Sequence, residues 1–343
     1  MASIPIIDLA PALSGNPNDT TAVANEIYQA FKHVGFAYIK NHSVAENLVN
    51  EAFEWACDLF FPCPSAKFFA LPSSEKNKAP HPPEGWYHRG YSGIGREKVV
   101  QMVFDDAGIA QRRAVPDVKE SYEIGNETDE TMKNIWIPEE SLPGFRGFFN
   151  MFFEECSRLE TLLLRLLAIG MGLDESFLLE FHKNRTNQCR LLHYPPVEES
   201  LLKTGKAERI AAHTDFSTMT ILFQDSVGGL EVESIHEKGK FVPAPYIPGT
   251  AVVNIGDLLM RWSNHELRST MHRVSAPPLE GGGDGEEEKE RMTRERYSIP
   301  YFVSPDRDSI IECLPTCYGE GRPKMYEAIR SSEYIAMRMN ATY

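Results

Sequence analysis

Two histidines and an aspartate occur in two short motifs that are able to bind one metal ion. His213 and Asp215 flank Thr214, and His272 follows Met271 further along the chain. Two imidazoles and one carboxylate can hold Fe(II) on one face and leave its other positions open for a co-substrate and oxygen. On a strand, residues two apart point to the same side, which would turn His213 and Asp215 together into a barrel. These residues therefore predict a mononuclear non-haem iron centre.

An arginine and a serine downstream repeat this spacing. Arg296 and Ser298 would share one face of a strand that Pro300 and Phe302 continue. The planar guanidinium of arginine matches a carboxylate with two parallel hydrogen bonds, which lysine cannot do. The apolar run 299–303 indicates that Arg296 is buried, and a buried arginine needs an anion. The pair is thus predicted to bind the far carboxylate of a co-substrate.

The elements that must position these residues are short and β-prone. From residue 188 onward, such runs are separated by turn residues, and this spacing is typical of a sandwich or barrel rather than of alternating strands and helices. The runs cover residues 189–194, 218–223, 229–232, 251–255 and 297–303. We expect a jelly roll, that is, a mainly β fold with flanking helices.

The N-terminal half is predicted to be largely helical, and one further helix closes the chain. Strands are expected at 4–9 and 35–39, and helices at 19–34 (capped by Asp19), 44–61, 143–172 and 324–339. The resulting divisions are an N-terminal mixed region (1–120), a helical segment (121–187), the core (188–310) and a C-terminal helical segment (311–343). We expect them to form one structural unit.

Composition and charge exclude some classes of function. Hydrophobic residues make up 42% of the 343 residues, which is enough for a large core. The formal net charge of -14 opposes binding to nucleic acid. The six cysteines form no Cys-x-x-Cys pair, and neither a basic apolar leader nor a membrane-spanning stretch is apparent, so a reduced cytoplasmic protein is expected. The Gly/Glu-rich insertion around residues 280–290 is assigned no chemistry.

The chain resembles the Fe(II)/2-oxoglutarate-dependent dioxygenases of the branch that includes isopenicillin N synthase. The resemblance runs nearly end to end, through residues 4–9, 35–42 and 90–97 and then through a more specific series in family order. That series is His213-Thr214-Asp215, Gly228-Gly229-Leu230-Glu231-Val232, Asn254-Ile255-Gly256-Asp257, Ser269-Thr270-Met271-His272-Arg273-Val274 and Arg296-Tyr297-Ser298. It implies a distorted double-stranded β-helix with N-terminal helices and a C-terminal helix.

The resemblance also implies roles for single residues. The metal ligands would be His213, Asp215 and His272, while Arg296 and Ser298 would hold the C5 carboxylate of 2-oxoglutarate. The tyrosine that commonly lies near the co-substrate is matched by Tyr194. Many plant members carry asparagine two residues earlier, where this chain has Leu192.

The interpretation is an oxygenase that uses Fe(II), 2-oxoglutarate and O2 to oxidise a C–H bond of a small organic molecule, with release of succinate and CO2. The outcome would be hydroxylation, desaturation or ring formation. Candidate substrate contacts are Phe216, Phe302, Arg190 and Tyr91. Three alternatives remain open: an iron oxidase that does not use 2-oxoglutarate, a non-catalytic jelly-roll binding module, and a zinc hydrolase. Substrate identity and oligomeric state do not follow from the sequence.

Overall fold

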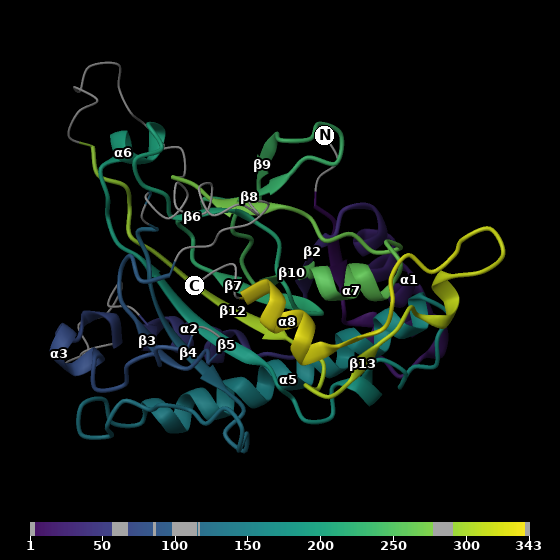
Figure 1. The fold of residues 1–343 in the computed structure, drawn as a ribbon, viewed down its shortest axis with the longest axis horizontal. Coiled ribbons are helices and arrows are strands. Elements are labelled where there is room, and N and C mark those ends of the chain that lie inside the picture. The colour runs from purple at the N-terminus through teal and green to yellow at the C-terminus, as the bar shows by residue number, and fades with distance from the viewer. Residues whose placement is uncertain are drawn as a thin grey trace.

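Two facing β-sheets form the centre of the molecule, with helices packed against the larger one (Figure 1). The computed structural model describes residues 4–56, 68–84, 87–97, 115, 117–276 and 291–339. The larger sheet comprises, in spatial order, β1 (Ile6–Asp8), β2 (Phe36–Lys40), β10 (Thr250–Ile255), β7 (Met219–Gln224), β12 (Arg296–Val303), β5 (Gln188–Tyr194), β4 (Glu120–Gly125) and β3 (Gly90–Ser92). The smaller one comprises β6 (Ile210–His213), β11 (His272–Val274), β8 (Leu230–Glu233) and β9 (Phe241–Pro243). The predicted mainly β jelly roll with flanking helices is confirmed.

Alternate residues of the larger sheet serve two different purposes. On β12, Tyr297, Ile299 and Tyr301 lie in the main hydrophobic core. Arg296 and Ser298 instead line a pocket between the two sheets. Because the side chains of a strand alternate between its faces, one face of this sheet builds the core and the other builds the pocket.

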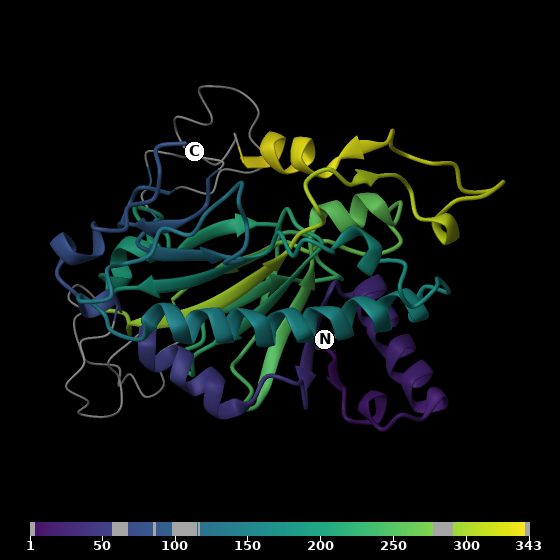
Figure 2. The same cartoon turned by 90° about the horizontal axis from the view of Figure 1, so that it is seen from below.

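The core face is covered by a long helix, α5 (Phe145–Gly170), which crosses beneath the sheet in Figure 2. Its buried side chains are mostly phenylalanine and leucine, and it packs against α1 (Pro17–His33) and α2 (Glu46–Ala56). A Cβ on Gly170 would lie 2.3 Å from the backbone oxygen of Ala24, so the close approach of α5 to α1 requires glycine. The helical layer thus holds the sheet from the side away from the pocket.

Several predicted boundaries were wrong. The N-cap of α1 is Asn16, whose side chain accepts a hydrogen bond from the Asn18 N–H, and Asp19 lies in the first turn instead. The segment expected to be helical from residue 121 begins with β4, a strand buried along its whole length. The final helix, α8 (Ser331–Met339), begins later than expected because residues 329 and 330 form β14 (Ile329–Arg330), which pairs with β13 (Ile310–Ile311).

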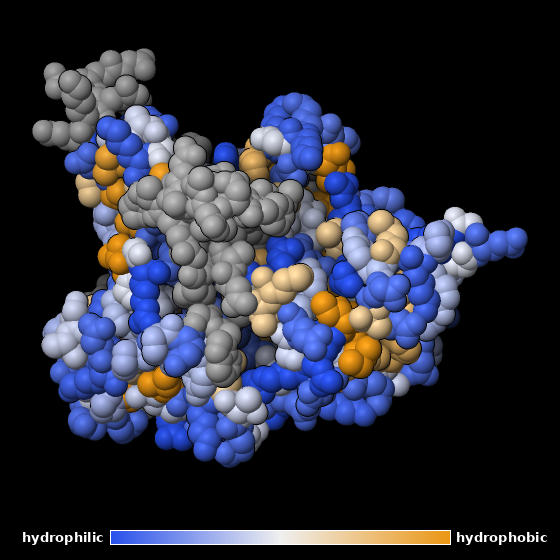
Figure 3. All heavy atoms as spheres, in the orientation of Figure 1, coloured by the Kyte–Doolittle hydropathy of each residue, from blue (hydrophilic) through white to orange (hydrophobic). Residues whose placement is uncertain are grey.

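The C-terminal stretch lies across the mouth of the sandwich. Helix α8 contributes Ile335 to the lining of the pocket. The face shown in Figure 3 is mostly hydrophilic, with apolar side chains interrupting it near α8, where Met337 is 56% exposed. Among the described residues, no helix combines the length and the apolar character needed to cross a membrane. The Gly/Glu-rich insertion at 280–290 lies outside the described residues.

Candidate active site

The structure brings the three predicted metal ligands together. His213 on β6 lies directly opposite His272 on β11 in the antiparallel register, and their ring centroids are 4.3 Å apart. The Nε2 atom of each histidine lies 3.8 Å from Oδ1 of Asp215. One ligand atom from each residue therefore falls within 4.8 Å of the others, which fits a shared ion. We call these three residues the first triad.

Hydrogen bonds orient every member of the first triad. Nδ1 of His213 lies 2.9 Å from the Ala211 carbonyl oxygen, and Nδ1 of His272 lies 3.2 Å from that of Thr270. A carbonyl only accepts, so each Nδ1 carries the proton and each Nε2 keeps the lone pair that a metal needs. This outer layer of contacts prepares both imidazoles as ligands.

The carboxylate of Asp215 is oriented by two neutral donors. Its Oδ2 accepts hydrogen bonds from Thr220 Oγ1 at 2.6 Å and from Asn254 Nδ2 at 2.8 Å. Oδ1 is left facing the two histidines. Neither donor was predicted to act here, although Asn254 lies in a motif that the family resemblance had marked.

Electrostatics favour the ligand forms of these groups. Burial, together with the nearby His272, lowers the pKa of His213 to about 4, so its imidazole is neutral at pH 7. Burial alone would raise the pKa of Asp215, but the two histidines and the two hydrogen bonds bring it below its ordinary value. Neutral imidazole nitrogens and an ionised carboxylate oxygen are the donor set that suits Fe(II).

The strand argument for Asp215 was wrong in its detail. β6 ends at His213, and Asp215 lies in the turn beyond it. Its position is fixed by the backbone, because the Asp257 N–H donates to the Asp215 carbonyl oxygen at 2.7 Å. Asp257 also accepts a hydrogen bond from Thr214 and pairs with Arg338 of α8 at 2.6 Å. The turn that carries the carboxylate is thus tied to α7 (Asp257–Trp262) and to the C-terminal helix.

Arg296 lies in the same pocket and is 1% exposed. Its Nε donates to the Gly228 carbonyl oxygen at 2.8 Å, and its Nη1 donates to Ser298 Oγ at 3.0 Å. The guanidinium lies 5.0 Å from the centre of the Tyr194 ring, on the strand that pairs with β12. Arg296, Ser298 and Tyr194 therefore form one end of the pocket, and Leu192 adds an apolar wall beside them.

Three of the four candidate substrate contacts line this pocket: Arg190, Phe216 and Phe302. The Arg190 guanidinium lies 5.6 Å from the centre of the Phe302 ring. Tyr91 differs, because its side chain packs in the main core and its hydroxyl donates to Glu120. Tyr91 is not among the described residues that line the pocket.

A second group of two histidines and a carboxylate includes His88, which lines the pocket. His81, His88 and Glu123 are all buried, and one ligand atom of each lies within 4.8 Å of the others. We call these residues the second triad. The guanidinium of Arg190 contacts Glu123 at 2.9 Å and Glu97 at 3.0 Å. The carboxylate of the second triad is therefore already paired with a cation.

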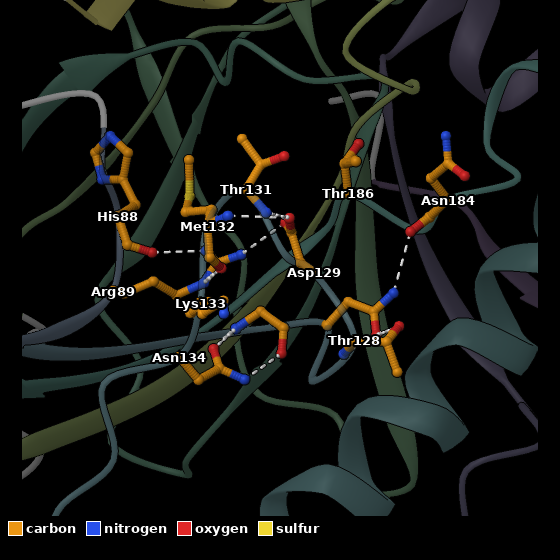
Figure 4. A network of polar contacts seen from close by, with 12 residues as sticks. His88, Arg89, Thr128, Asp129, Thr131, Met132, Lys133, Asn134, Asn184 and Thr186 are labelled. Carbon is orange, nitrogen blue, oxygen red and sulfur yellow. Dashed lines mark hydrogen bonds and ion pairs between the residues drawn. The ribbon is translucent and has the colours of Figure 1, made fainter.

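A network of backbone and side-chain contacts holds His88 in place (Figure 4). The buried Arg89 donates to the carbonyl oxygens of His88 at 2.6 Å and Met132 at 3.2 Å, and it lies 3.7 Å from Asp129. A Cβ on Gly125 would lie 1.7 Å from the Arg89 guanidinium, so any larger residue there would displace Arg89 from this network. The network fixes the wall of the pocket to which His88 belongs.

Comparisons with known proteins agree with this geometry. Residues 4–140 match the family described as non-haem dioxygenase in morphine synthesis N-terminal, and residues 186–305 match the 2OG-Fe(II) oxygenase superfamily. The proline hydroxylase buaE of Petromyces alliaceus is 39% identical, with 98% of each chain covered. The 2-oxoglutarate-dependent dioxygenase frbA of Dothideomycetidae sp. is 37% identical over 99% of this chain and 97% of its own length.

A solved structure of similar fold contains the co-substrate. A full-length Neurospora crassa protein, crystallised in complex with alpha-KG and thymine, is 39% identical, covers 99% of this chain and 97% of its own, and superposes with a TM-score of 0.84. The matches cover both halves of the chain and include the segments that carry the first triad and Arg296. This chain belongs to the Fe(II)/2-oxoglutarate-dependent oxygenases and is an oxidoreductase that uses iron and 2-oxoglutarate.

Proposed function

We propose that the first triad binds the iron and that Arg296, Ser298 and Tyr194 bind 2-oxoglutarate. The observation that carries this proposal is the convergence of His213, Asp215 and His272 on one point inside the pocket. When bound, iron and 2-oxoglutarate supply the activation of O2, with release of succinate and CO2. The protein's own side chains orient the reactants and exclude water.

Each part of the pocket has a separate task in this proposal. Arg296 anchors the C5 carboxylate of 2-oxoglutarate, and Ser298 both accepts from Arg296 and keeps its hydroxyl proton for the same carboxylate. Leu192 replaces the asparagine of many plant relatives with an apolar surface, so the binding of 2-oxoglutarate depends on Arg296 and Ser298 rather than on a side-chain amide. These residues hold the co-substrate in one orientation relative to the first triad.

We further propose that the substrate is a small nitrogen-containing ring. Arg190 and Phe302 would face it on one side of the pocket, with Phe216 opposite, so that a polar and an aromatic surface meet the same molecule. Two similar proteins support this class, because one is named a proline hydroxylase and the other was crystallised with thymine. Because Tyr91 lies in the core, it has no part in this proposal.

The residue assignment is tested by anaerobic titration. Fe(II) and 2-oxoglutarate added to the protein should produce the visible charge-transfer band of their chelate. We expect Asp215→Ala to abolish the band, and Arg296→Ala to weaken the binding of 2-oxoglutarate while iron binding persists. An unchanged affinity for 2-oxoglutarate in Arg296→Ala would contradict the assignment. The substrate is tested by scoring succinate release across pyrimidines, cyclic amino acids and open-chain amino acids.

The four sequence divisions are also proposed to act as one unit. Strands β1, β2, β3 and β4 come from the first 125 residues and join the same sheet as β5, β7, β10 and β12. A boundary at residue 120 would cut through β4. Limited proteolysis followed by thermal unfolding tests this proposal, which expects a single cooperative transition.

A further inference from the structure

A second buried arginine, Arg209, lies beside the proposed 2-oxoglutarate site. It immediately precedes β6 and is 1% exposed. One terminal nitrogen donates to the Arg294 carbonyl oxygen. Its Nε and Nη1 atoms are buried and have no hydrogen-bond partner in the part of the chain that the structure describes. Burying donors of a charged group without partners is costly, so a negative charge nearby would stabilise Arg209.

Arg209 and Arg296 contact the same aromatic ring. The guanidinium of Arg209 lies 6.0 Å from the centre of the Tyr194 ring, and that of Arg296 lies 5.0 Å from it. The surrounding side chains are apolar, since Leu192, Tyr194, Ile210 and Val274 form a small hydrophobic cluster. Two like charges are therefore held close together where water cannot screen them.

Among the residues that the structure describes, the negative charge near these two arginines is incomplete. Burial and the charge of Arg296 lower the pKa of Arg209 to about 10, and the carboxylate of Asp225 acts in the opposite direction. Asp225 is itself partly buried, which raises its pKa, and it accepts hydrogen bonds from the backbone N–H groups of Tyr297 at 2.6 Å and Val227 at 3.0 Å. One carboxylate that already has two other partners faces two guanidinium groups.

We propose that Arg209 is a second cationic residue of the 2-oxoglutarate site, where it stabilises the C5 carboxylate together with Arg296. This inference rests on the proposed function and extends it to a residue outside the Arg-x-Ser pair. Arg209 is not among the described residues lining the pocket. It acts from behind Tyr194 through its charge and through the orientation of that ring, so it is a positioning residue. The C5 carboxylate of the co-substrate then completes the charge balance of this end of the pocket.

The test compares two ligands that differ only at the proposed point of action. 2-Oxopentanoate has the 2-oxo acid end and the chain length of 2-oxoglutarate but lacks the C5 carboxylate. Dissociation constants for both are measured by calorimetry on protein loaded anaerobically with Fe(II). Arg209→Met should weaken 2-oxoglutarate binding about 10-fold, the scale expected for a charge that acts through the protein interior without direct contact. It should leave 2-oxopentanoate binding within about twofold.

Three further variants make the result decisive. Arg158→Met on the exposed face of α5 removes the same charge far from the pocket and should not alter the preference between the ligands. Arg209→Lys keeps the charge but not the planar fork, and we expect an intermediate loss. Should Arg209→Met fail to fold, Arg209→Gln, which removes the charge but keeps a polar side chain, decides: a preference reduced at least about threefold supports the proposal, and an unchanged one overturns it. Equal weakening of both ligands would show a merely structural role and also overturn it.

Failure of this inference is distinguishable from failure of the proposed function. If Arg296→Met loses the preference for 2-oxoglutarate and Arg209→Met retains it, the pocket assignment stands and the role of Arg209 falls. If Arg296→Met itself retains the preference, the site lies elsewhere and both proposals fail.

Discussion

The two triads each contain two imidazoles and a carboxylate, and they differ in what surrounds the carboxylate. Asp215 of the first triad accepts hydrogen bonds from the neutral side chains of Thr220 and Asn254, so its negative charge remains available to a cation. Glu123 of the second triad contacts Arg190 at 2.9 Å and accepts from Gln188 at 2.8 Å. Two histidines and a carboxylate therefore suit a metal only when the charge of the carboxylate is not already neutralised.

The second triad belongs instead to a buried network of alternating charges. Arg190 bridges Glu123 and Glu97, and Lys119 pairs with Glu97 at 2.7 Å. Burial raises the pKa of Glu123, but Arg190 and His88 outweigh this effect and lower it to about 2. The network presents fixed charges to the pocket and has no spare negative charge for an ion.

Within the described part of the chain, the buried carboxylate of Glu160 on α5 is surrounded by neither a metal site nor a paired cation. It accepts hydrogen bonds from Asn187 at 2.6 Å and from the Tyr301 hydroxyl at 3.2 Å. Neither donor is charged, and burial raises the pKa of Glu160 to about 8. A buried acid without a cation or a metal thus stays protonated at neutral pH.

The largest expected effect separates the two triads by metal binding. Asp215→Ala should lose Fe(II) binding completely, because the only carboxylate among the three ligands is gone and two neutral imidazoles remain. Glu123→Gln should still bind one iron per chain. Equilibrium dialysis under anaerobic conditions measures both stoichiometries, and a loss of iron in Glu123→Gln would show that the second triad takes part.

The next effect concerns the cation that distinguishes the second triad. Arg190→Met leaves Glu97 and Glu123 buried without their shared partner, which should lower the free energy of unfolding by about 3–5 kcal/mol. Adding Glu123→Gln to that variant should recover part of the loss, since one uncompensated charge is removed. Urea unfolding at pH 7 measures both changes. Equal stability of the single and double variants would mean that the charge of Glu123 does not matter.

The raised pKa of Glu160 predicts that the free energy of unfolding depends on pH. Its pKa is raised to about 8 in the folded protein from an ordinary value of 4.5. The contribution of the protonated Glu160 to the free energy of unfolding is therefore complete below pH 4.5 and is lost as the pH rises towards 8. Glu160→Gln keeps the acceptor for Asn187 but does not titrate. We expect the variant to be close to the wild type near pH 5 and to exceed it by about 4 kcal/mol at pH 9. Urea unfolding at both pH values measures this, and parallel curves for the two proteins would refute it.

The sequence predicted those parts of the site that depend on residue type and order, but not those that depend on register. The first triad and Arg296 were found because their chemistry is distinctive. Thr220 and Asn254 are ordinary polar residues of β7 and β10, and they meet at Asp215 only because these strands pair. Arg209 was missed for a similar reason, because its burial cannot be read from the charged segment that precedes β6.

The fold shows the same division between periodic and tertiary information. The apolar stripe of α5 and the β-prone runs after residue 188 were predicted from their periods. β4 was missed because it contains Glu120 and Glu123, polar residues that its neighbours bury by pairing. The second triad depends on that strand, so no local pattern could have indicated it.

The smallest expected effect tests whether the neutral donors matter to the first triad. Asn254→Ala removes the 2.8 Å hydrogen bond to Asp215, while the 2.6 Å bond from Thr220 remains. Loss of such an outer contact lowers metal affinity about 10- to 100-fold, so we expect the affinity for Fe(II) to fall towards the lower end of that range. Competitive titration against a metal-sensitive dye measures it.

Asn254→Asp provides the sharper control, because it places a second negative charge beside Asp215 in nearly the same volume. If a neutral hydrogen bond is what orients the carboxylate, this variant should not restore the wild-type affinity, even though its added charge attracts cations. An affinity equal to or above that of the wild type would mean that total negative charge, and not the orientation of one carboxylate, distinguishes the first triad from the second.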